Sequence, residues 1–178
     1  MNRLVGHRAL ITGSLERTGL GIAEKLASEG AEIILHGRLD DDRVRDARAR
    51  IEAIGGTTPK VVFGDVTDPK ACAGLAEQIS NLSILVNNVG VYRPTDLAKT
   101  SAEHWRWTLA GNLDATFFMS QAFLPQLLAS GRGRLIQIGY VTCDRLRGTG
   151  QATAYQIAKT GVHLLSQSFA LRFAHRGL

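Results

Sequence analysis

Cysteine is scarce in this sequence, because only Cys72 and Cys143 occur among its 178 residues. Two cysteines without a recurring spacing exclude a disulfide framework. The five histidines form neither an HExxH motif nor a cysteine–histidine cluster, which are the usual signs of a metal site. We therefore expect no bound metal and a reducing compartment.

Long hydrophobic runs are also missing. No apolar stretch approaches the ~18 residues that suggest a membrane-spanning helix. A strand-like segment begins at His7, which leaves no room for a signal peptide. These patterns predict a cytoplasmic protein that has no membrane partner.

A concentrated basic patch is the third missing feature, although the formal net charge is +5. The arginines of residues 40–50 are interspersed with aspartates, which is typical of a solvated helix face. A nucleic acid is therefore not the expected partner. Salt-sensitive DNA binding would reveal that alternative.

What the sequence does contain is a regular alternation of strand-like and helix-like segments. Such alternation predicts βαβ units, hence an α/β domain over residues 1–178 with a parallel sheet between two helical layers. The expected strands are 7–12, 31–36, 60–64, 83–87 and 134–138. The expected helices are 20–29, 40–54, one that starts at Asp68 and Pro69, 100–129 from a capping-box spacing, and 151–175.

A glycine-rich segment, residues 12–21, joins the first expected strand to the first helix. Gly13 is followed by five residues and then by Gly19, Leu20 and Gly21. Glycines at this place let the backbone approach a pyrophosphate, and the helix N-terminus offers free N–H groups to it. The spacing is not GxGxxG, so a simple connecting turn remains the alternative.

The end of the second expected strand points to the choice of dinucleotide. An acidic residue there would hold the ribose 2′-hydroxyl of NAD, but the sequence has Gly37 and Arg38. Arg38 offers a fork of donors to a 2′-phosphate, and Arg17 in the glycine segment is placed to assist. The predicted cofactor is therefore NADP(H).

Tyr155 and Lys159 stand four residues apart on one face of the last expected helix. A neighbouring ammonium favours the phenolate, so we expect a lowered pKa for Tyr155. Such a phenol can give a proton to a carbonyl oxygen or take it back from an alcohol. The pair alone is weak evidence, since a solvent-exposed pair would give the same pattern.

Taken in order, these motifs resemble the short-chain dehydrogenases/reductases. The resemblance extends from the first strand to the last residue and rests on residues 12–21, 64–66 and 86–90, Asn112, and the pair Tyr155 and Lys159. It implies a doubly wound Rossmann fold with strand order 3-2-1-4-5. It also implies that the two long helices pair copies of the chain into a homodimer or homotetramer.

The resemblance further assigns roles to single residues. Asp65 would bond the adenine amino group and Val66 would present its backbone to the ring. Asn88 and Gly90 would line the path of the cofactor ribose. Asn112 would hold a water that links Lys159 to solvent, and Lys159 would also hold the nicotinamide ribose. The spacing from Gly13 through Arg17 to Gly19 is similar to the pteridine-reductase subgroup, whereas the middle of the chain looks like 3-oxoacyl reductases and sugar-acid dehydrogenases.

Two features depart from the family pattern. A serine usually follows the fifth strand and holds the substrate oxygen, but counting from the strand gives Tyr140 and counting back from Tyr155 gives Thr142. Asp144 is a more remote candidate. In addition, the chain ends where family members continue into further strands and a substrate lid. The leading hypothesis is an enzyme that interconverts a small carbonyl compound and its alcohol, and the alternative is a cofactor-binding subunit without activity.

Overall fold

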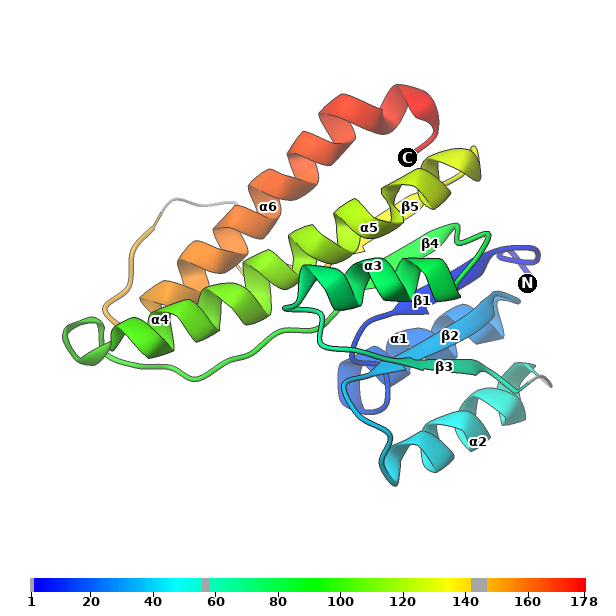
Figure 1. Cartoon of the computed structure of the whole chain (residues 1–178), viewed down its shortest axis with the longest axis horizontal. Helices are drawn as coiled ribbons and strands as arrows, with labels where there is room; N and C mark the ends of the chain where they lie inside the picture. The colour runs from blue at the N-terminus through cyan, green and yellow to red at the C-terminus, as the bar shows by residue number, and fades with distance from the viewer. Residues whose placement is uncertain (1, 56–57, 142–146) are drawn as a thin grey trace.

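The computed structural model describes residues 2–55, 58–141 and 147–178, so Thr142 and Asp144 lie outside the described residues. Its strands are β1 (Arg8–Ile11), β2 (Glu32–Gly37), β3 (Lys60–Phe63), β4 (Ile84–Asn87) and β5 (Arg134–Gln137). Its helices are α1 (Arg17–Ser28), α2 (Arg43–Gly55), α3 (Pro69–Gln78), α4 (Ala102–Leu109), α5 (Ala115–Ala129) and α6 (Thr153–Phe173) (Figure 1).

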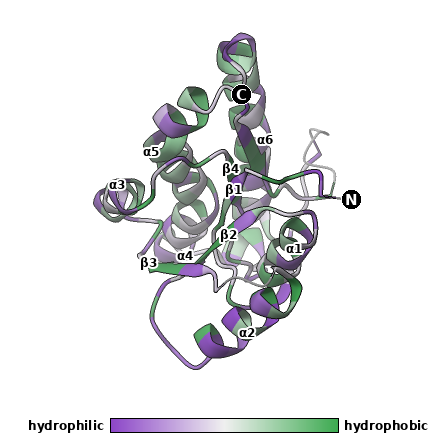
Figure 2. Ribbon diagram, turned by 90° about the vertical axis from the view of Figure 1, so that its right-hand side faces the viewer, coloured by the Kyte–Doolittle hydropathy of each residue, from purple (hydrophilic) through white to green (hydrophobic). Residues whose placement is uncertain are grey.

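The five strands form one parallel sheet in the order β3-β2-β1-β4-β5, as the resemblance implies. Figure 2 shows the sheet between two layers, with α3 and α5 on one side and α1 on the other. In this doubly wound order, successive strands are added on one side of β1 up to β3 and on its other side from β4 onward, so the strand order reverses between β1 and β4. A ligand site is therefore expected at the carboxyl ends of these strands.

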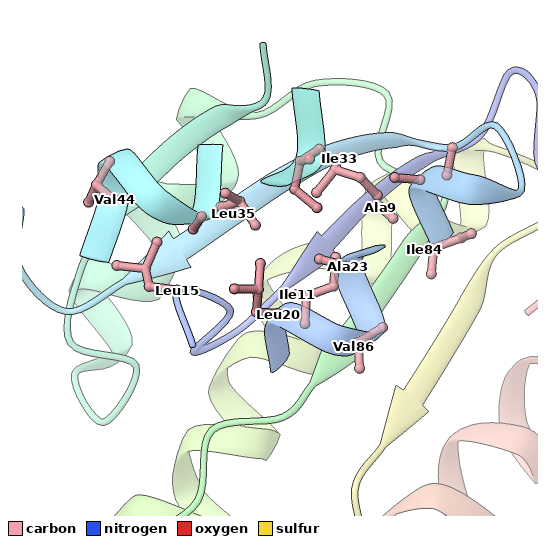
Figure 3. Close-up of a cluster of buried hydrophobic side chains, with 14 residues drawn as sticks. Ala9, Ile11, Leu15, Leu20, Ala23, Ile33, Leu35, Val44, Ile84 and Val86 are labelled. Atoms are coloured by element: carbon pink, nitrogen blue, oxygen red, sulfur yellow. The ribbon is translucent and has the colours of Figure 1, made fainter. Parts of the chain in front are cut away.

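Side chains that alternate along the strands fill two separate cores. Ile11, Leu35 and Val86 point toward α1 and α2 (Figure 3). Leu10 and Leu85 pack instead with residues of α3 and α5. Strands that are covered on both faces must be apolar on both, which explains the continuous hydrophobic runs in the sequence. β5 pairs only with β4 among the described residues, and its side chains are half-buried or exposed.

The long helix expected over residues 100–129 is wrong in two details. Ser101, not Thr100, caps the N-terminus, because its hydroxyl accepts the His104 amide at 3.1 Å. The helix is also interrupted by one π-helical turn, Ala110–Asp114, between α4 and α5. Side-chain hydroxyls of this helix bond carbonyls four residues earlier, which favours such local distortion. In the described part of the chain, no helix has the length and hydrophobicity to cross a membrane.

Candidate active site

The glycine segment closes tightly between β1 and α1. A Cβ at Gly19 would lie 2.3 Å from the Gly13 carbonyl oxygen and 2.7 Å from the Asn88 amide nitrogen. Gly13 itself has φ +61°, a conformation that side chains other than glycine rarely adopt. The segment therefore needs glycine at both positions, and it brings the N-terminus of α1 close to the backbone of Gly13.

Asn88 holds this segment against the loop that follows β4. Its side-chain amide donates to the carbonyls of Thr12 and Gly13 at 2.9 and 3.2 Å. The Thr12 hydroxyl in turn accepts the backbone amides of Asn88 and Val89. Asn88 thus positions the glycine segment, and its side chain is engaged within the protein.

His36, at the end of β2, connects three loops and was not assigned a role from the sequence. Its Nδ1 accepts the Gly13 amide, and its Nε2 lies 3.1 Å from the Gly64 carbonyl oxygen. These partners require the neutral form with hydrogen on Nε2. Burial is the main cause that lowers the pKa of His36 to about 4. A single histidine near the end of an apolar strand gives no sequence signal for this buried role.

Acid should therefore destabilise the protein through His36. An unfolded histidine titrates near 6.5, so below that pH the unfolded chain binds a proton that the folded chain refuses until about pH 4. The free energy of unfolding should be unaffected above pH 6.5 and fall by about 3 kcal/mol as pH drops to 4. Urea unfolding across this range should show a shallower decline in His36→Asn than in the wild type. His163→Asn, on α6, is the matched control, and an equally steep decline in His36→Asn would refute the assignment.

A cavity of about 380 Å³ opens beside the glycine segment, at the carboxyl ends of β1, β2 and β3. Of the predicted cofactor residues, Gly13, Arg38, Asp65 and Val66 line it. Arg38 and Asp65 bond each other at 2.9 Å, and the Arg38 side chain is 77% exposed. Hydrogen bonds from Thr67, followed by the charge of Arg38, hold the pKa of Asp65 below its usual range. Asp65, which is predicted to bind the adenine, and Arg38, which is predicted to bind the 2′-phosphate, therefore lie side by side in the wall of this cavity.

Two other predicted cofactor residues, Arg17 and Leu20, do not line the cavity. Arg17 begins α1, and its side chain is 88% exposed beside Glu16. Leu20 is buried in the core, and its amide bonds the Glu16 carbonyl. Arg43, which the sequence analysis missed, lines the cavity instead and pairs with Glu16 at 2.7 Å and with Asp41 at 2.6 Å.

The predicted catalytic residues converge next to the cavity. Gly90 lies between Val89 and Val91, which line the cavity. A Cβ at Gly90 would be 2.9 Å from Asn112 Oδ1 and 3.5 Å from Lys159 Nζ. Asn112 and Lys159 are both buried. The structure thus brings Gly90, Asn112 and Lys159 together, although they come from three distant parts of the chain.

Asn112 sits in the π-helical turn, and its amide nitrogen donates to the carbonyls of Val91 and Thr108 at 2.9 Å each. Its Oδ1 is buried and has no hydrogen-bond partner among the described residues. π-Helical turns recur at functional sites. A buried acceptor left open beside an ammonium group is the arrangement that a bridging water would complete.

Tyr155 and Lys159 lie on one face of α6, as their spacing predicts. Lys159 Nζ is 5.9 Å from the centroid of the Tyr155 ring and donates to the Ile138 carbonyl at 2.7 Å. The pKa of Tyr155 is raised, first by burial and then by the phenols of Tyr92 and Tyr140. The expected lowering is therefore wrong for this structure, because burial and the two neighbouring phenols disfavour the charged phenolate.

Tyr140, one of the two candidates for the serine position, reaches α6. Its ring packs edge-to-face on Tyr155, with centroids 5.7 Å apart, and its hydroxyl accepts the side-chain amide of Gln156 at 3.2 Å. Tyr92 packs on Tyr155 in the same manner at 4.9 Å. The other candidate, Thr142, lies outside the described residues.

Comparison with known proteins agrees with this geometry. A family model described as short chain dehydrogenase matches residues 7–178. The chain belongs to the short-chain dehydrogenases. One relative is galactitol 2-dehydrogenase (L-tagatose-forming) of Cereibacter sphaeroides, which is 33% identical over 99% of this chain and 69% of its own. Another is the 3-oxoacyl-[acyl-carrier-protein] reductase of Haemophilus influenzae, 36% identical over 97% of this chain and 70% of its own.

A solved short-chain dehydrogenase structure supports the fold directly. The 3-oxoacyl (acyl-carrier-protein) reductase of Agrobacterium tumefaciens C58, with NADP bound, superimposes with a TM-score of 0.89 at 34% identity. The match covers 99% of this chain and 68% of that one. Family membership makes the protein an oxidoreductase that uses a nicotinamide dinucleotide on a carbonyl or alcohol group.

Proposed function

We propose that this chain is an NADP(H)-dependent oxidoreductase that reduces a carbonyl compound, or oxidises a secondary alcohol, with Tyr155 as the proton donor. The convergence of Asn112, Lys159 and Gly90 beside the cavity, with Tyr155 one helical turn from Lys159, carries the proposal. The proposed class of reaction is that of 3-oxoacyl or pteridine reductases. NADPH consumption with ketones, acyl thioesters, sugars and pterins tests it, with Tyr155→Phe as the decisive variant.

The residues around the cavity fit a dinucleotide. The glycine segment has no room for a Cβ at Gly19, and the cavity extends from this segment to Asp65 and Val66. Asp65 and Val66 would hold the adenine, Arg38 would hold the 2′-phosphate, and Lys159 would hold the nicotinamide ribose. A bound nicotinamide supplies the hydride.

The proton is moved by side chains of this chain. Tyr155 is protonated at neutral pH, because its pKa lies above the usual value, and its phenol is therefore ready to donate to the substrate oxygen. Lys159 stabilises the phenolate that remains, since its ammonium lies over the Tyr155 ring. Asn112 would complete the relay, because its Oδ1 can accept a hydrogen bond from a water molecule. That water would return a proton to Tyr155 by way of Lys159.

The choice of NADP over NAD depends on Arg38. Arg38→Asp should weaken NADPH binding about 10- to 100-fold, because a charge-assisted hydrogen bond to the 2′-phosphate is replaced by a repulsion. NADH binding should change little. Arg45→Asp is the matched control, since Arg45 carries the same charge on α2 but does not line the cavity. Fluorescence titration with both cofactors measures the effect, and equal weakening for NADPH and NADH would refute the phosphate role.

Assembly and location follow as proposals of the same kind. Pairing of two or four copies through α4–α5 and α6 is supported by exposed apolar residues on these helices, Phe117, Ile157, Leu164 and Leu171. Light scattering of the purified protein measures it, and a monomer at micromolar concentration would refute it. A small carbonyl compound or alcohol is the proposed substrate, and the cytoplasm is the proposed compartment, which fractionation of cells would test.

A further inference from the structure

All three tyrosines of the chain meet at the proposed proton donor. Tyr92 follows β4, Tyr140 follows β5 and Tyr155 belongs to α6. Tyr92 and Tyr140 each pack edge-to-face on Tyr155, at interplanar angles of 71° and 81°. A substrate oxygen that reaches the Tyr155 hydroxyl must therefore come close to these two rings, which we call the aromatic pair.

The Tyr140 hydroxyl is bound to a side chain of α6. It accepts the Gln156 amide at 3.2 Å, and the Gln156 carbonyl oxygen accepts the Thr149 hydroxyl at 2.8 Å. This connection anchors the end of the Tyr140 side chain to α6. Tyr140 consequently contacts Tyr155 through its ring, and the ring has a fixed orientation before any substrate binds.

Tyr92 has the opposite character, because it is 64% exposed although its ring touches Tyr155. Its position next to Tyr155 leaves a broad aromatic surface open to a ligand. Edge-to-face and offset-stacked contacts between rings are favourable beyond the area they bury, so this surface discriminates in favour of flat unsaturated rings.

We propose that the aromatic pair, Tyr92 and Tyr140, selects substrates whose carbonyl or carbinol carbon carries an aromatic or unsaturated ring. The inference rests on the proposed function, since it concerns the same Tyr155. It names a substrate class and two residues that determine it. Neither residue takes part in the proton transfer.

A matched pair of ketones tests the proposal. Phenyl methyl ketone and cyclohexyl methyl ketone have nearly the same size but differ in ring unsaturation. The ratio of their kcat/KM values is measured for the wild type, Tyr92→Leu and Tyr140→Leu, so that any intrinsic difference in reactivity cancels between variants. Each leucine variant should lower the preference for the phenyl ketone about two- to tenfold, mainly through KM.

Tyr140→Phe separates the ring from the hydroxyl. This variant keeps the ring and should keep the preference for the phenyl ketone. A phenyl preference that falls in Tyr140→Phe as much as in Tyr140→Leu would assign the selection to the hydroxyl and overturn the proposal. An unchanged ratio in both leucine variants would also overturn it. A wild type that binds NADPH but reduces neither ketone, nor any other carbonyl compound tested, would instead refute the proposed function.

Discussion

Tyr155→Phe should lower kcat for carbonyl reduction by about 10²- to 10⁴-fold, the usual contribution of a positioned general acid. The substitution removes only the hydroxyl, so the ring contacts with Tyr92 and Tyr140 are kept. NADPH binding should change much less, because the predicted adenine and phosphate contacts of Asp65 and Arg38 lie at the other end of the site. The expected result is a folded protein that binds its cofactor and turns over very slowly.

The measurement compares steady-state NADPH oxidation in the wild type and Tyr155→Phe for the substrate that the panel identifies. Urea unfolding and NADPH fluorescence titration of both proteins are the controls for folding and binding. Full activity in Tyr155→Phe would refute the mechanism. Cofactor binding without turnover of any substrate by the wild type would support the alternative, a non-catalytic cofactor-binding protein.

The raised pKa of Tyr155 gives the reaction a direction-dependent pH profile. For reduction the phenol must carry its proton, so the rate should be constant through neutral pH and fall only in alkaline solution. For alcohol oxidation the phenolate is the base, so the rate should rise with pH over the same alkaline range. Tyr155→Phe should lose both dependences, and this serves as an additional readout of the same variant.

The strand order was predictable because each step of the argument depends on local sequence and a general rule. Alternating apolar and amphipathic segments require βαβ units, and parallel units connect in few ways. The start of α1 was placed three residues late because Arg17 and Thr18 are not apolar, so periodicity gave no sign of them. The π-helical turn was missed because α5, which follows it, is apolar on nearly all sides. An extra residue rotates the following helix face by about 100°, but such a helix has no distinct face to show the shift.

The candidate site was predictable where function requires a particular residue type. Gly13, Gly19 and the pair Tyr155 and Lys159 have few substitutes for their proposed chemistry. In the structure Gly19 lies against Gly13, and Lys159 lies near Gly90, next to the cavity. The partners of charged side chains were not predictable. Arg38 bonds Asp65, which lies 27 residues further along the chain, and only the parallel pairing of β2 with β3 brings them together.

His36 and Arg43 show the same limit from the other side. Each lines the cavity and connects distant segments around it, His36 by binding Gly13 and Gly64, and Arg43 by binding Glu16. A single histidine at the end of an apolar strand, or a single arginine in a charged stretch, has no pattern that reveals these roles. Sequence reasoning consequently chose Arg17, which lies in the glycine segment but points to solvent.

The second large effect is expected from Gly19→Ala. The added methyl group would lie 2.3 Å from the Gly13 carbonyl oxygen, and this neighbour is backbone that cannot rotate away. The first turn of α1 must then move away from Gly13. This displacement should lower the free energy of unfolding by about 3 kcal/mol. The shift also disturbs the N–H groups that the proposed pyrophosphate needs, so NADPH affinity should fall roughly 100-fold.

Gly21→Ala is a matched control two residues further along the same helix. A Cβ at Gly21 meets no atom within 4 Å. Alanine in a helix is more favourable than glycine by about 1 kcal/mol, so Gly21→Ala should be as stable as the wild type or more so, with unchanged NADPH affinity. Urea unfolding and fluorescence titration of both variants decide the matter. If Gly19→Ala bound NADPH as tightly as Gly21→Ala, the close contact between α1 and Gly13 would have no part in cofactor binding, and the site would have to lie elsewhere.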